Sequence, residues 1–316
     1  MVHFPVSMNQ SNLYSQKLNN SAALCIEIGH YDRAIFSLTK ALRISRAQTD
    51  EGMLCVCRCR SCSLDGCIAY TESSPPVAKL AQQTTTSMDI VSRCNGWGCG
   101  YVYRRPIRVP PQSILENHNM GRILFLIITF NLALAHHLSA IATATPMTTP
   151  AASSGEDKAA LNQSQEQQRQ QQLTQSGSRK AKMLKKALQL YEVSNYWHSR
   201  ITASMPLTGH DCDLAGGLSS IRFQMILSNN LSHIHCLSSD QTKQQEFLEN
   251  LLSTVMVAVE YQTRSNNSSN SSSSNNHRTN DSESTSHEGD LCTKHLEGFM
   301  MNASRLFLCR HCADAA

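Results

Sequence analysis

The clearest pattern of apolar positions lies near the start of the chain, between Asn19 and Ile44. Ile35, Leu38 and Leu42 recur at spacings of three and four residues, which predicts a helix with one buried face. Gly29 separates this period from an apolar period that precedes it. The pattern therefore predicts two helices joined by a short turn.

Small residues stand where two such helices would have to approach closely. They are Ala22, Ala34 and Ala41, and Tyr31 follows the turn glycine as a packing anchor. Together these positions resemble the tetratricopeptide repeat (TPR) family, whose unit is a helix–turn–helix of about 34 residues. The resemblance implies a helical hairpin over residues 15–46. A repeat of this kind provides a binding surface and carries no catalytic chemistry.

Two further stretches match the first hairpin. The stretch 130–138 places Asn131 in the position of Asn20, and residues 184–188 (LKKAL) match residues 38–42 (LTKAL) after a long interruption. A third stretch begins at Asn230 and continues without a gap, although it lacks small residues and a turn glycine. The resemblance implies a second hairpin over 122–200 and a third over 225–261. The alternative is three unrelated amphipathic helix pairs.

Two low-complexity tracts separate these elements. Residues 162–176 are rich in glutamine, and residues 266–276 consist of serine and asparagine alone. Neither tract can bury enough apolar surface to offset the entropy of ordering it. We therefore expect an all-α fold of TPR-like hairpins, forming an α-solenoid with long disordered insertions. The remaining expected segments are a disordered insertion over 142–178, a Cys-rich and extended linker over 47–121, a disordered Ser/Asn-rich stretch over 262–288 and a C-terminal segment over 289–316.

Charge and cysteine content restrict the function. The net charge is +4 and the basic residues are scattered, so no nucleic-acid footprint is expected. The chain begins without a basic stretch followed by an apolar run, which argues against a secretory signal. Thirteen cysteines without such a signal favour reduced thiols. We therefore expect a cytoplasmic protein, with the nucleus as the alternative.

One segment, Ile123 to Ala142, has the length and apolar content of a membrane span, which needs about 20 residues. It contains Asn131, His136 and His137, however, which are costly in lipid unless they face protein or water. The first helix of the second hairpin accounts for the same residues. We favour this buried helix over a membrane-anchored protein, which is one alternative hypothesis.

A cysteine cluster between residues 55 and 99 provides a second alternative hypothesis, a zinc-binding adaptor. Four thiolates close a tetrahedral zinc site when they come in two closely spaced pairs. Cys59 with Cys62, and Cys94 with Cys99, would supply such pairs in a zinc-binding adaptor. Their spacing matches no zinc module, so we expect a loop with reduced thiols and neither a metal nor another cofactor.

Residues 101–110 mix aromatic, β-branched and basic side chains, which predicts a short extended segment. Pro106 would confine it to the edge of a sheet. Its arginines would either bind an acidic peptide or phosphate, or form a solvated face. No hydrolase elbow, phosphate-binding glycine loop, zinc-protease motif or kinase signature occurs in the sequence, so no enzyme is expected.

The resemblance also implies where a partner would bind. In TPR arrays the first helix of each hairpin lines a concave groove that holds a peptide. Chaperone-binding members clamp a carboxylate with lysines and arginines on this face, which has none here, so we expect an extended or helical partner segment without strong charge. The protein is therefore expected to be a protein–protein interaction scaffold. The expected groove residues are Asn19, Asn20, Ala23, Ile26, Glu27, Phe130, Asn131, Leu134, His137, Asn229, Asn230, His233 and Cys236.

Overall fold

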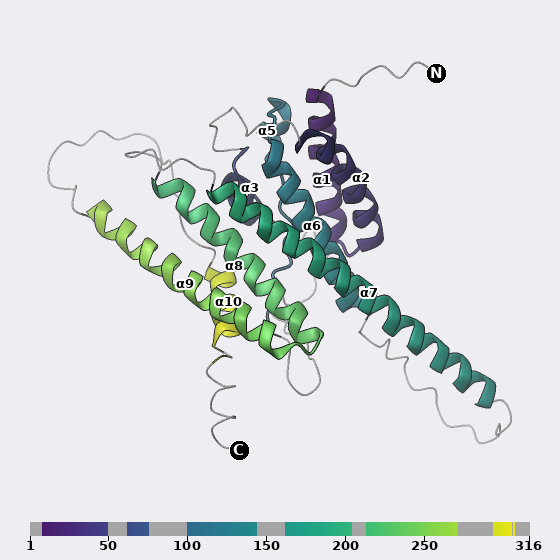
Figure 1. Cartoon of the computed structure of the whole chain (residues 1–316). Coiled ribbons are helices and arrows are strands. Elements are labelled where there is room, and N and C mark those ends of the chain that lie inside the picture. Colours follow the sequence, from purple (N-terminus) through teal and green to yellow (C-terminus); the bar gives the residue numbers. More distant parts are fainter. Residues whose placement is uncertain are drawn as a thin grey trace, which may run out of the picture. The chain divides into compact units, whose positions relative to one another are not determined.

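The computed structural model describes residues 8–49, 62–75, 100–143, 162–203, 213–270, 293–304 and 306. Within these ranges the chain forms nine α-helices and no strand (Figure 1). The predicted all-α class is confirmed. The chain divides into two compact units, and the following paragraphs take each unit by itself. The first unit comprises Met1–Cys62, Pro76–Ala78 and Pro106–Tyr196, and the second comprises Ser63–Pro75, Lys79–Arg105 and Trp197–Ala316.

The first unit begins with the hairpin of α1 (Met8–Glu27) and α2 (Tyr31–Thr49), which pack side by side (Figure 1). Gly29 has φ +82°, a conformation that is strained for residues with a Cβ, and this permits the tight turn. Ala22, Ala34 and Ala41 are fully buried. The small residues therefore lie where the apolar pattern required close contact.

The next helices of the first unit are α5 (Pro111–Leu115) and α6 (Gly121–Ala142). Helix α6 packs against α2 and α1. It is the one helix in the described part of the chain that is long and apolar enough to cross a membrane, yet 94% of its most apolar stretch is buried in the structure. A core helix passes the same test, so α6 is weak evidence for a membrane span.

Helix α7 (Asn162–Ala203) corrects the predicted insertion over 142–178. Tyr191 of this helix lies 5.8 Å from Phe130 of α6 between ring centroids, so the turn around Tyr191 belongs to the core of the first unit, whereas residues 197–203 belong to the second unit. The same helix includes the glutamine-rich tract, and its residues 174–179, at the end of the tract and just beyond it, are exposed. Glutamine, lysine and arginine are good helix formers, so the helix extends from its packed turns without needing to bury the tract. Residues 144–161 lie outside the described residues.

The second unit contains α3 (Leu64–Ser73), α8 (Asp213–Leu237), α9 (Gln241–Asn270) and α10 (Thr293–Ala303). Helices α8 and α9 form the second tight hairpin (Figure 1). Ser239 takes the left-handed position in its turn, with φ +59°, and Asp240 caps α9 by accepting a hydrogen bond of 3.2 Å from the backbone of Lys243. This pair thus closes without the glycine that the first hairpin uses.

Three further expectations about segment boundaries change. Helix α9 continues to Asn270, so the start of the stretch 262–288 is helical, and residues 271–288 lie outside the described residues. The expected linker over 47–121 contains helices α3 and α5. Residues 100–110 have no regular secondary structure, so the expected sheet edge at Pro106 is wrong. A different set of hydrogen bonds holds this segment.

Candidate functional site

In the first unit, two asparagine side chains each bind both backbone groups of one residue. The amide of Asn20 accepts a hydrogen bond of 2.8 Å from the N–H of Val109 and donates one of 2.7 Å to its carbonyl. Asn131 does the same at Ile107, with distances of 2.8 and 2.7 Å. A carboxamide carries one acceptor and two donors, so it satisfies a backbone amide as a neighbouring strand would.

A third asparagine supports this arrangement. Asn19 donates to the carbonyl of Ile107 at 3.1 Å and accepts a hydrogen bond of 2.9 Å from Asn131. Asn19 and Asn131 are fully buried, whereas Asn20 is half-buried. Helix α1 therefore supplies an adjacent pair of asparagines, and α6 supplies the single asparagine that completes the set.

The second unit repeats the arrangement with a pair on α8 and a single residue on α10. Asn230 binds the N–H and carbonyl of Tyr103 at 3.0 and 3.1 Å. Asn302 binds those of Tyr101 at 2.8 and 2.7 Å. Asn229 donates to the Tyr101 carbonyl at 3.2 Å and accepts from Asn302 at 2.6 Å. Each unit thus contains the same three-asparagine clamp.

In both units the clamped residues are two apart, namely 101 with 103 and 107 with 109. In an extended chain, alternate residues present their backbone N–H and C=O groups at one edge and their side chains on one face. The clamps therefore hold extended backbone, as the sequence predicted for this segment. Because they bind only main-chain groups, they do not depend on which residues the segment contains.

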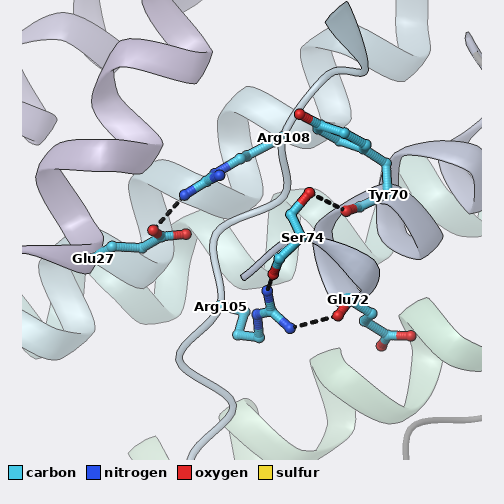
Figure 2. A network of polar contacts seen from close by, with 6 residues as sticks. All are labelled: Glu27, Tyr70, Glu72, Ser74, Arg105 and Arg108. Carbon is cyan, nitrogen blue, oxygen red and sulfur yellow. Dashed lines mark hydrogen bonds and ion pairs between the residues drawn. The ribbon is translucent and has the colours of Figure 1, made fainter. Parts of the chain in front are cut away.

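The side chains of the segment make separate contacts in the first unit. Ile107 and Val109 are fully buried, whereas Arg108, between them, forms an ion pair with Glu27 at the end of α1 (Figure 2). The side chains of Arg108 and Glu27 are 12% and 7% exposed. Arg108 is therefore bound to an acidic side chain of its own chain and does not form a solvated face.

Arg105 is fixed in the second unit by the end of helix α3. Its guanidinium donates to the carbonyls of Glu72 at 2.9 Å and Ser74 at 2.5 Å (Figure 2). Carbonyls at a helix C-terminus lack intrahelical partners and carry partial negative charge, so they suit a cation. Burial raises the pKa of the Glu72 carboxyl, and the nearby charges of Arg222 and Arg105 oppose that rise.

Tyr101 anchors the other end of the clamped segment on α10. Its hydroxyl lies 2.6 Å from Nδ1 of His295, and its ring meets the edge of Phe299 at 5.6 Å. A Cβ added at Gly298 would lie 2.5 Å from the tyrosine ring. The close approach of ring and helix therefore depends on a glycine.

The expected groove residues fall into three groups in the structure. Asparagines 19, 20, 131, 229 and 230 bind the segment or support its clamp, and Glu27 binds Arg108. Cys236 is partly exposed. The remaining residues are buried, namely Ala23, Ile26, Phe130, Leu134, His137 and His233. The asparagines and Glu27 therefore contact a segment of this same chain, and the uncharged partner segment stays a prediction.

Sequence reasoning missed Asn302. The signal that could have found it is shared by all four asparagines that pair with both backbone groups: each is followed two positions later by alanine or serine. These residues are Ala22, Ala133, Ser232 and Ser304. In α10 the asparagine and the small residue two positions later are not accompanied by the apolar period of a full hairpin, so the sequence analysis did not identify Asn302.

One buried histidine in each unit, His136 and His198, is held neutral. Burial lowers the pKa of His136 to about 4, and the nearby charge of Lys186 adds to the effect. Burial likewise lowers the pKa of His198 to about 4. Both side chains are therefore core groups that resist protonation.

Three of the four candidate zinc ligands cannot be placed. Cys59, Cys94 and Cys99 lie outside the described residues, and Cys62 is buried. Among the residues whose placement is described, no group of three or more His, Cys, Asp or Glu side chains could hold a metal ion. The zinc hypothesis therefore stays a prediction.

Comparisons with known proteins found no protein-family model, no curated protein and no solved structure that matches the chain.

Proposed function

We propose that this protein is a protein-interaction scaffold that holds extended polypeptide by its backbone, on faces built from TPR-like helix pairs of an α-solenoid. The observation that carries the proposal is the three-asparagine clamp, which occurs once in each unit. A buried asparagine without a partner is costly, so such residues are suited to a site that is filled by backbone amides.

The clamp resembles strand addition in its chemistry. Proteins that add a peptide to a sheet edge gain affinity from main-chain hydrogen bonds and specificity from pockets for alternate side chains. Here the side-chain amides of helices take the place of the sheet edge. The resident segment 101–109 occupies the clamps, and a partner segment would replace it.

The test uses the full chain with Ile107→Pro, Arg108→Ser and Val109→Pro. Proline has no backbone N–H, so the segment loses the two donors whose hydrogen bonds Asn131 and Asn20 accept, and the clamp of the first unit opens. Fluorescence anisotropy would measure binding of a labelled peptide with the sequence of residues 105–110. We expect saturable binding to the opened chain and much weaker binding to the unaltered chain, whose own segment is tethered at high effective concentration.

The control for backbone recognition is the same peptide methylated on the amide nitrogens of Ile107 and Val109. Methylation removes the two N–H donors that Asn131 and Asn20 accept, so it should abolish binding. Circular dichroism would first establish that the opened chain keeps its helices. Equal binding of both peptides, or no binding to an opened helical chain, would contradict the proposal.

A further inference from the structure

Side-chain contacts of the resident segment distinguish one position from its neighbours. Ile107 and Val109 are fully buried, and Pro106 and Pro110 beside them are also buried. Arg108 alone in this stretch meets a charged group of α1. The backbone clamps cannot tell one sequence from another, so the first unit can distinguish sequences only through side chains. The burial of Ile107 and Val109 favours apolar residues there, and the contact of Arg108 is the charged contact of this stretch.

Glu27 is placed where an anion is unfavourable on its own. It is the last residue of α1, and the C-terminus of a helix carries partial negative charge that destabilises a carboxylate. Its side chain is also only 7% exposed, so water does little to compensate. The guanidinium of Arg108 offsets both penalties (Figure 2).

We propose that the first unit selects an extended segment in which an arginine lies between two apolar residues, and that Glu27 is the residue that recognises the arginine. This inference rests on the proposed function and names the class of partner. The resident segment has the required pattern, Pro-Ile-Arg-Val-Pro, so a partner would compete with it by presenting the same chemistry.

The first arm of the test varies the charge in the peptide assay. Peptides with Arg108→Ala and Arg108→Glu should bind the opened chain at least about tenfold more weakly than the parent, because one partner of a buried charge pair is lost. Opened chain carrying Glu27→Arg should reverse the order and favour the Arg108→Glu peptide. The matched control is Asp32→Arg, an exposed acid of the same unit whose reversal changes the net charge equally.

The second arm keeps the resident segment and needs no opened chain. Glu27→Arg and Arg108→Glu would each be made in the full chain, together with the double variant, and exchange of the Ile107 and Val109 amides would be followed by NMR. Each single reversal should speed exchange about tenfold or more, and the double variant should restore most of the protection.

The outcomes separate the two proposals. If no peptide binds an opened chain that keeps its helices, the peptide-binding function fails. If the parent peptide binds but Arg108→Ala and Arg108→Glu peptides bind equally well, the function stands and the selection by Glu27 is wrong. Should the opened chain not fold, additive effects in the double variant would overturn the selection, and rescue would support it.

Discussion

Replacing Asn131 by alanine should be among the most damaging single changes in the first unit. The side chain is fully buried and makes three hydrogen bonds, two to the backbone of Ile107 and one to Asn19. Asn131→Ala removes the partner of the Ile107 N–H and of the Asn19 side-chain oxygen, whereas the Ile107 carbonyl keeps its bond from Asn19. The loss therefore falls on two buried polar groups.

Each buried group left without a partner costs roughly 1–3 kcal/mol. The change from asparagine to alanine returns about 0.7 kcal/mol in helix propensity. The expected loss in the free energy of unfolding is therefore about 3 kcal/mol. Asn20 makes a similar pair but is half-buried, so water can replace part of its contribution, and Asn20→Ala should cost only about 1 kcal/mol.

Urea denaturation followed by circular dichroism would measure both losses. Asn250→Ala, at an exposed position of α9, is the control for helix propensity and should be neutral or slightly stabilising. The reasoning is refuted if Asn131→Ala costs no more than this control. It is also refuted if Asn20→Ala costs more than Asn131→Ala.

Three further changes test the packing. Burial holds the pKa of His136 at about 4, below its ordinary 6.5, so the unfolded chain binds more protons than the folded chain between these pH values. The free energy of unfolding should therefore fall as the pH drops from 6.5 to 4. Urea unfolding at several pH values should show a shallower fall for His136→Gln than for the unaltered chain. Ala34→Trp and Ala23→Trp should each cost about 1–3 kcal/mol by overpacking, since both positions are fully buried, and a harmless Ala34→Trp would contradict the hairpin. Gly298→Ala should lower the thermal midpoint of unfolding, because the added Cβ forces the ring of Tyr101 to move. Gly177→Ala, whose added Cβ meets nothing within 4 Å, should raise the midpoint. A higher midpoint for Gly298→Ala than for Gly177→Ala would contradict the packing of α10.

The first hairpin could be predicted because its signals are local. Apolar residues at spacings of three and four, with small residues at Ala34 and Ala41, mark the first hairpin within the stretch from Asn19 to Ile44. Even there Ala23, which we expected among the residues that line a groove, is fully buried. Asparagines that we expected along that groove bind another part of the same chain.

The filled clamps could not be predicted from the sequence because their contacts are long-range and involve main-chain atoms. Asn230 binds Tyr103 across 127 positions, and Asn302 binds Tyr101 across 201. A backbone amide is the same at every residue, so the segment carries no mark of which asparagine it meets. The asparagines themselves were visible at Asn20, Asn131 and Asn230 because they share one place in the repeated pattern.

The central claim is that each asparagine holds one particular residue of the segment. Amide hydrogen exchange resolved by NMR at Tyr101, Tyr103, Ile107 and Val109 would test it in four variants of the full chain. These are Asn302→Ala, Asn230→Ala, Asn131→Ala and Asn20→Ala. Each variant should lose protection most at the amide that its asparagine binds, with smaller changes at the other three amides. The expected pairs are Asn302 with Tyr101, Asn230 with Tyr103, Asn131 with Ile107 and Asn20 with Val109. Unchanged protection at the partner amide, or the same loss at all four amides in every variant, would contradict the account.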